Sequence, residues 1–193
     1  MTSPDAPTAE QDSSTQPPTS PISRLAKAIG QAARFPGDVF GMGTGEKAAL
    51  ARMDPDAPRP HQIAALSRAL IQAGLEPEQW RPETWKRWAL IAHGMALAGH
   101  GGREPLGVQL SVAGVAESRI TKLLTARADA FFQLIPPLLR LLASKDVSPN
   151  WNELGNLILN EGRSETEAQE KAEEIRMKIA GRYFSEKARA AHN

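Results

Sequence analysis

The stretch that decides the fold is LGVQLSVAGVAESRITKLLTARADAFFQLIPPLLRLLASKDVSPNWNEL, residues 106–154. Apolar residues recur in it every three or four positions, which is the period of an amphipathic helix. It also concentrates positive charge: five cations and one acid lie between Arg119 and Lys145, a local net charge of +4 in a chain of net charge +1. We therefore expect this stretch to build part of a helical core and to carry the functional surface.

The composition predicts an all-α protein. The chain has 193 residues, of which 41% are hydrophobic, enough for one compact domain or two small ones. Helix-favouring Ala, Leu, Glu, Lys and Arg outnumber Val, Ile and Tyr. The absence of cysteine excludes disulfides and thiolate metal sites and suits a reducing compartment. No apolar run could span a membrane and no signal peptide is evident, so we expect a cytoplasmic protein without a membrane partner.

Changes in composition predict four segments. Residues 1–20 are rich in Pro, Ser and Thr and predict a disordered arm. Residues 21–98 predict an N-terminal helical bundle, residues 99–105 (GHGGREP) a linker, and residues 106–193 a C-terminal helical bundle. Within the bundles the apolar period predicts nine helices. The first runs from residue 22 to before Pro36, and the next four are expected at 45–53, 61–73, 82–98 and 106–113. Four more are expected to begin at about residues 116, 129, 151 and 164.

Several helix ends carry recognisable signals. We expect Thr44, Asp129 and Asn150 to be N-caps, the last together with Glu153. Ser164 to Glu167 form a capping box before the final helix. Pro136 and Pro137 are expected to kink or restart the helix that contains them, because proline lacks an amide donor and crowds the preceding turn.

No enzymatic motif is present. His61, His93, His100 and His192 share no metal-ligand spacing, and neither GxSxG nor a P-loop occurs. GMGTGEKAAL at residues 41–50 places glycines before a lysine at a helix start, but it lacks the P-loop spacing, so a flexible loop or a phosphate contact is the preferred interpretation. Asp54 and Asp56 are typical of a solvated turn, and His93 of a hydrogen-bonded core. We expect no catalytic residue, cofactor or metal.

The tryptophans allow two interpretations. Arg81, Lys86 and Arg87 interleave with Trp80, Trp85 and Trp88, which is compatible with base stacking. Helical core spacing favours packing for Trp85 and Trp88, and Trp151 is also expected in the core.

The basic residues of the central stretch divide into two kinds. At 100° per residue, Arg119 and Lys122 point away from the apolar stripe of their helix. Arg127 points where the stripe does, so it is either buried with a carboxylate or emerges at a groove, and Arg140 is enclosed by leucines. Such cations would contact phosphates strongly by charge and weakly by sequence.

The same stretch resembles two kinds of DNA-associated protein. VQLSVAGVAESRITKLL is similar to a helix-turn-helix, although its outward residues are not a strong base-reading set. The order of Leu-Gly at 106–107, Ala-Gly-Val followed by Ser-Arg, Leu-Leu-x-Ala-Arg at 123–127, Leu-Leu-Ala-Ser-Lys at 141–145 and Pro-x-Trp at 149–151 resembles the CasB family, the small subunit of the type I-E CRISPR complex Cascade. GEKAALARMDPDAP at 45–58 is similar to the early basic helix of that family.

The CasB resemblance implies two helical bundles with no catalytic centre. It implies contacts to the backbone subunits, the large subunit and a second copy of the chain, and a basic surface that holds guide RNA, target DNA or the displaced strand to stabilise the R-loop. By position it assigns that role to Arg119, Lys122, Arg127, Arg140 and Lys145, and by extension to Lys47 and Arg52. A helix-turn-helix regulator and a purely structural adaptor are the alternatives.

Overall fold

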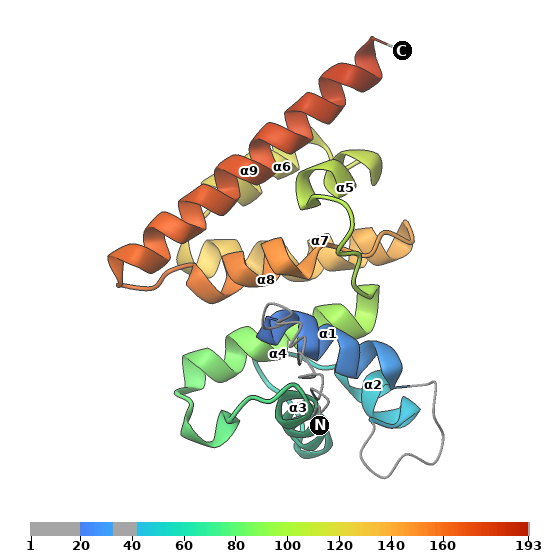
Figure 1. Cartoon of the computed structure of the whole chain (residues 1–193), viewed down its shortest axis with the longest axis vertical. Coiled ribbons are helices and arrows are strands. Elements are labelled where there is room, and N and C mark those ends of the chain that lie inside the picture. The colour runs from blue at the N-terminus through green and yellow to red at the C-terminus, as the bar shows by residue number, and fades with distance from the viewer. Residues whose placement is uncertain (1–19, 33–41, 193) are drawn as a thin grey trace, which may run out of the picture.

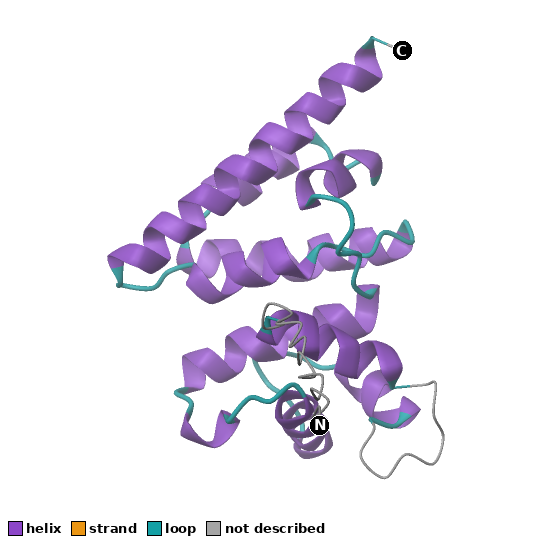
Figure 2. Cartoon of the chain, in the orientation of Figure 1, coloured by secondary structure: helices purple, strands orange, loops and turns teal. Residues whose placement is uncertain are grey.

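Figure 1 shows the computed structural model of the chain, which describes residues 20–32 and 42–192. These ranges contain nine α-helices, one short 3-10 helix and no strand, so the predicted all-α class is confirmed (Figure 2). No helix in the described part of the chain is long and apolar enough to cross a membrane. The predicted arm lies outside the described residues apart from Ser20, which caps the first helix by accepting a hydrogen bond from the Ser23 amide at 3.1 Å.

The helices form three layers along the long axis of the molecule (Figure 1). One outer layer holds α1 (Pro21–Gln31), α2 (Thr44–Ala51), α3 (Pro60–Gln72), the 3-10 helix η1 (Pro77–Gln79) and α4 (Pro82–Ala98). The middle layer holds α7 (Ala128–Ser144) and α8 (Trp151–Asn160). The other outer layer holds α5 (Leu106–Val112), α6 (Glu117–Thr125) and α9 (Thr166–Ala191). In the middle layer, α7 and α8 both pack on α4, and α8 also packs on α1. On the other side, α9 packs on α5 and α8.

Local signals set many helix ends as expected. Prolines occupy the first position of α1, α3 and α4, where a missing amide donor costs nothing. Gly74 and Gly114 follow α3 and α5 with φ of +70° and +71°, a left-handed conformation that glycine adopts without a Cβ clash. Asn150 caps α8, and its side chain accepts a hydrogen bond from the Asn152 amide.

Three predicted caps are wrong because the helices begin at other positions than expected. Thr44 is the first residue of α2, and Gly43 is the cap, with its amide bound to the Glu46 carboxylate at 2.9 Å. The α9 helix begins at Thr166 after Glu165, with no side-chain cap from Ser164. The α7 helix begins at Ala128, one residue before Asp129, and the Ala128 amide donates to the distant Glu161 carboxylate at 2.7 Å. A tertiary partner therefore replaces the local cap at α7.

The α7 helix continues through Pro136 and Pro137 without a restart, and the predicted alternative of a kink stays a prediction. Its apolar face (Phe131, Ile135, Leu138, Leu139 and Leu142) is fully buried and holds the helix against its neighbours. The prolines lie on the other face, where Pro136 is half-buried and Pro137 is exposed. Because that face borders open space, water can reach the backbone oxygens that the prolines leave without an amide donor.

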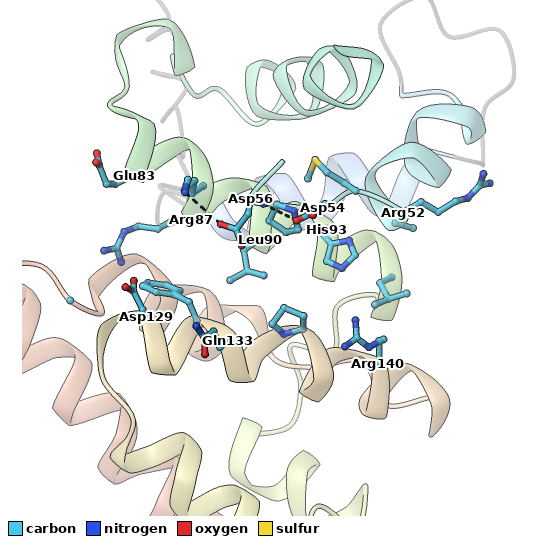
Figure 3. Close-up of a pocket in the computed structure, with 18 of the residues that line it drawn as sticks. Arg52, Asp54, Asp56, Glu83, Arg87, Leu90, His93, Asp129, Gln133 and Arg140 are labelled. Carbon is cyan, nitrogen blue, oxygen red and sulfur yellow. Dashed lines mark hydrogen bonds and ion pairs between the residues drawn. The ribbon is translucent and has the colours of Figure 1, made fainter. Parts of the chain in front are cut away.

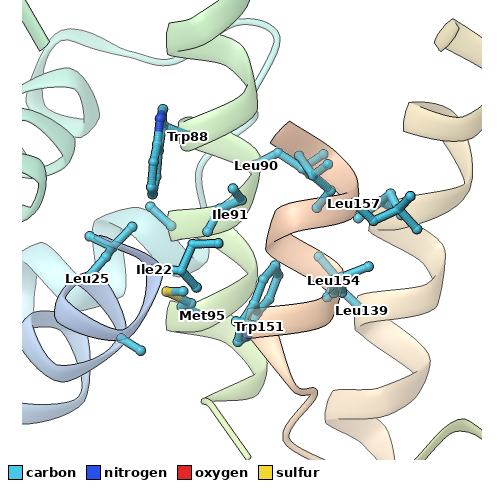
Figure 4. Packing of buried hydrophobic residues seen from close by; sticks show 14 of the residues in the cluster. Ile22, Leu25, Trp88, Leu90, Ile91, Met95, Leu139, Trp151, Leu154 and Leu157 are labelled. Atoms are coloured by element: carbon cyan, nitrogen blue, oxygen red, sulfur yellow. The ribbon is translucent and has the colours of Figure 1, made fainter. Parts of the chain in front are cut away.

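The core joins the outer layer of α1 and α4 to the middle layer (Figure 4). Trp151 at the start of α8 is fully buried, as predicted, and stands directly against Gly94 of α4. A Cβ at Gly94 would come within 2.3 Å of the Trp151 ring and 2.8 Å of Leu139. The predicted packing of Trp88 is also confirmed, since it is 6% exposed, and Trp85 is half-buried against the same core.

Residues 99–105 are anchored along their length. The Trp151 indole donates to the Gly99 carbonyl at 2.8 Å, and the Gly101 amide donates to the Pro149 carbonyl at 3.1 Å. The Asn150 side chain donates to the Glu104 carbonyl at 3.0 Å. This segment therefore binds to the residues that precede α8, while the division into two separate bundles stays a prediction.

Gly94→Ala should lower the free energy of unfolding by about 1–3 kcal/mol, because the added methyl must displace the buried Trp151 ring. Gly181→Ala is the matched control: a Cβ at this α9 position meets nothing within 4 Å, and alanine favours the helix by up to about 1 kcal/mol. Urea unfolding of both variants measures the difference. Equal stabilities would contradict the tight contact between α4 and α8.

Candidate nucleic-acid interface

The α6 helix presents a solvent-facing surface with two unpaired cations. Ile120 and Leu123 are buried, while Arg119 and Lys122 are exposed, as predicted. Neither cationic side chain has an ion pair or hydrogen bond within the described residues. Both are therefore available to an external anion.

Two threonines on the same helix turn their hydroxyls inward to the backbone. The Thr121 hydroxyl donates to the Glu117 carbonyl at 3.0 Å, and the Thr125 hydroxyl donates to the Thr121 carbonyl at 2.8 Å. A hydroxyl engaged in this way offers no donor to a base edge. The two hydroxyls keep only their acceptor capacity toward a base edge, and the main feature of the surface is its exposed charge.

Arg127 occupies a different position from the one that helical periodicity predicts. The α6 helix ends at Thr125, and Arg127 has extended backbone angles (φ −131°, ψ 154°), so extrapolating the α6 stripe to it is wrong. Its side chain is half exposed and pairs with the Glu173 carboxylate of α9 at 2.9 Å. The same guanidinium donates to the Leu124 and Ala126 carbonyls at the end of α6. The predicted carboxylate partner exists, but at the surface.

A buried ion pair fixes the connection between α6 and α7. Glu161, at the end of α8, is 2% exposed and Arg176 of α9 is 4% exposed, and the two side chains form an ion pair. Glu161 also accepts from the Ala128 amide, and Arg176 also donates to the Ala126 carbonyl at 3.1 Å and to Glu173 at 2.9 Å. These contacts hold Ala128 at a φ of +47°, which is uncommon for a residue with a side chain. We call Arg127, Glu161, Glu173 and Arg176 the Glu161 network.

A groove of about 960 Å³ separates α4 from α7 (Figure 3). Its apolar lining comes from both helices and includes Leu90, Leu97, Phe132 and Pro136. His93 lines it too and is 9% exposed, with Nδ1 3.0 Å from the Leu50 carbonyl oxygen, so its prediction as a hydrogen-bonded core histidine is confirmed.

Arg140 and Arg52 lie toward one end of this groove (Figure 3). Arg140 is exposed and is not enclosed by leucines, because it lies on the α7 face opposite the buried leucines. Arg52 follows α2 and is also exposed. Neither side chain has an ion pair or hydrogen bond to another described residue.

The other charges of the groove balance these cations. Glu83 and Asp129 lie toward the opposite end (Figure 3). Lys86 pairs with Asp56 at 3.6 Å, and the Asp54 carboxylate accepts from the Asp56 amide at 3.0 Å, as expected of a turn. A phosphate chain would meet free carboxylates if it followed the whole groove. The groove therefore offers an anion only the end that holds Arg52 and Arg140.

Arg87 is a structural cation in the same region. It donates to the Ile158 and Glu161 carbonyls at 2.6 and 2.5 Å, and its guanidinium lies 5.0 Å from the centre of the Phe132 ring. Burial, followed by the positive charge of Arg163, lowers the pKa of Arg87, and the acids around it oppose the shift. Its Nη1 atom is engaged by two backbone carbonyls and its guanidinium lies over an aromatic ring, so we assign Arg87 to the fold rather than to phosphate binding.

The seven predicted cations do not form one cluster. Arg119, Lys122 and Arg127 belong to the outer layer of α6, whereas Arg52 and Arg140 meet at the groove on the far side of α7. Lys145 is the exposed C-cap of α7, and Lys47 is half-buried on α2.

The groove itself escaped prediction, although the sequence contains a signal for its α7 wall. Asp129, Gln133, Pro136 and Arg140 follow the spacing of a single helix face, and all four line the groove. The signal is visible only if α7 is assumed to continue through its prolines.

The described ranges contain no group of three or more His, Asp or Glu side chains that could hold a metal ion. Their distinguishing features are the exposed, unpaired cations on a helical scaffold. This arrangement defines the class: an all-α protein with local surfaces of exposed positive charge.

The family follows from comparison with known proteins. The family model described as CRISPR-associated protein Cse2 matches residues 46–184, which is most of the chain. The chain therefore belongs to the Cse2 family, and it is a subunit of a CRISPR Cascade complex. The CasB resemblance is thus confirmed at the level of the family. No curated protein and no solved structure gives a significant match.

Glu161→Gln should lower the free energy of unfolding by about 3–5 kcal/mol, because it leaves Arg176 charged and buried without its ionic partner. Glu170→Gln, an exposed change on the α9 helix that carries Arg176, should leave stability nearly unchanged. Chemical denaturation of the two variants would test this difference, and a Glu161→Gln variant as stable as the control would contradict a structural role for the network.

Proposed function

We propose that this Cascade subunit is non-catalytic and holds the sugar-phosphate backbone of guide RNA, target DNA and the displaced strand, which stabilises the R-loop in antiviral defence. The observation that carries the proposal is that Arg119 and Lys122 on α6 are both exposed and have no ionic partner among the described residues. Membership of the Cse2 family supports the setting. The proposed location is the cytoplasm.

The proposed contacts extend beyond α6. Arg140 and Arg52 contribute a second anion-binding point at one end of the groove, and Lys145 and Lys47 contribute peripheral charge. Arg127 belongs to the same surface as α6, although Glu173 occupies it in the free protein. The partners are the backbone and large subunits and a second copy of the chain.

The physics of R-loop formation suits such a surface. The exchange of a DNA duplex for an RNA–DNA hybrid is nearly balanced in energy, so modest contacts to the backbone can shift it. Base pairing supplies the sequence recognition, and the protein needs only to hold phosphates. The inward-turned hydroxyls of Thr121 and Thr125 are consistent with that division of labour.

A helix-turn-helix regulator would behave differently. It would select a defined sequence from random DNA and keep a large preference for it as salt rises. A structural adaptor would bind no nucleic acid at low salt while still co-purifying with the other subunits. One selection experiment and one co-purification separate these alternatives.

The double variant Arg119→Gln/Lys122→Gln should reduce the slope of log affinity against log salt by about 1.4 on single-stranded DNA and about 1.8 on duplex. Each removed cation eliminates about one phosphate contact, whatever the base sequence. Titration of labelled oligonucleotides of arbitrary sequence, at several salt concentrations, measures this slope. The reconstituted complex with the same variant should retain its R-loop for a shorter time.

Lys27→Gln/Arg59→Gln is the matched control, because it removes two exposed charges from α1 and from the start of α3. Its slope should equal that of the wild type. If the two double variants behave alike, the assignment of Arg119 and Lys122 is wrong.

A further inference from the structure

One cation of the α6 surface already has an anion bound to it. The Glu173 carboxylate lies 2.9 Å from the Arg127 guanidinium through one oxygen and 3.1 Å through the other. The two side chains are 50% and 49% exposed, so an external phosphate can reach the pair from solvent. Glu173 thus occupies the face of Arg127 that a phosphate would use.

The backbone positions the guanidinium for this contact. The Nη1 atom of Arg127 donates to the Leu124 carbonyl at 2.9 Å and to the Ala126 carbonyl at 3.1 Å, which leaves Nη2 for the carboxylate. The end of α6 therefore holds Arg127 in place whether or not Glu173 is charged. Removal of the carboxylate charge would leave an ordered cation rather than a free-moving one.

Glu173 is not required to keep the interior intact. It also accepts from Arg176 at 2.9 Å, but Arg176 keeps Glu161 and the Ala126 carbonyl as partners. The adjacent Glu174 binds a different pair of cations, Lys171 at 2.8 Å and Lys178 at 2.5 Å. Of these two neighbouring acids, only Glu173 contacts Arg127 among the described residues.

We propose that Glu173 determines the nucleic-acid affinity of this protein by competing with phosphate for Arg127. The inference rests on the proposed function and adds to it a residue that limits the number of phosphates the α6 surface engages. In the wild type, Arg119 and Lys122 bind phosphates and Arg127 contributes little. The lower affinity allows the strand to be released and repositioned, while the complex relies on base pairing for recognition.

Glu173→Gln tests the proposal in the full-length protein, because glutamine keeps the shape and removes the charge. It should strengthen binding to single-stranded DNA of arbitrary sequence about two- to fivefold at low salt. It should also steepen the slope of log affinity against log salt by about 0.7, the value of one additional phosphate contact on a single strand. Glu170→Gln, one turn earlier on α9 and exposed, is the control for the change in net charge.

Arg127→Gln and the double variant Arg127→Gln/Glu173→Gln complete the cycle. Both should show the wild-type slope, because the proposal makes Arg127 the only route by which Glu173 acts. The proposal would be overturned if the double variant gained as much affinity as Glu173→Gln. It would also be overturned if Glu173→Gln and Glu170→Gln had the same slope of log affinity against log salt. Thermal unfolding of all four variants verifies that each is folded.

The outcomes separate this inference from the proposed function. If the wild type shows salt-dependent binding but Glu173→Gln and Glu170→Gln have the same affinity and slope, only the role of Glu173 is overturned and the proposed function stands. An absence of salt-dependent binding by the wild type and by Glu173→Gln overturns both. Steeper binding by Glu173→Gln that depends on Arg127 supports both.

Discussion

The arrangement of the layers depends on the close contact between the Trp151 ring of α8 and Gly94 of α4. Trp151 is the largest fully buried side chain, and only a residue without a Cβ at position 94 lets α4 approach it so closely. Its indole N–H also donates a hydrogen bond to the Gly99 carbonyl, which anchors the start of the segment between α4 and α5. Gly94 also lies against Leu139 of α7, since a Cβ there would come within 2.8 Å of that leucine, so the missing side chain lets α4 approach both helices of the middle layer.

The charges of the protein fall into those that hold the fold and those that remain free. Arg176 donates to the Glu161 carboxylate and the Ala126 carbonyl, and Arg87 donates to the Ile158 and Glu161 carbonyls, so removal of either would leave these acceptors without that partner. Arg119, Lys122 and Arg140 make no such contact within the described residues. Local charge at these free positions matters more than the net charge of +1, since electrostatic attraction to a phosphate falls off within about 10 Å in salt.

Membership of the Cse2 family and the geometry of α6 lead to one consistent picture. A subunit that assists an RNA-guided complex has no need to read bases, and the α6 surface offers cations while its threonine hydroxyls face the backbone. The predicted cations are divided between α6 and the groove, so the phosphate contacts that we propose fall at two separate places. A nucleic acid that touched both would have to cross the edge of α7 rather than lie in the groove, because Glu83 and Asp129 repel phosphate at its other end.

The sequence by itself determined the helical class, most helix positions and the outward direction of Arg119 and Lys122, because these depend on periodicity within one helix. It also determined the buried positions of Trp151 and His93. The tertiary structure alone decided the positions of Arg127 and Arg140. The α6 helix ends before Arg127, where Glu161 replaces a local cap for α7, and α7 continues through its prolines, which places Arg140 at the groove. Such outcomes depend on partners distant in the chain, which no local pattern encodes.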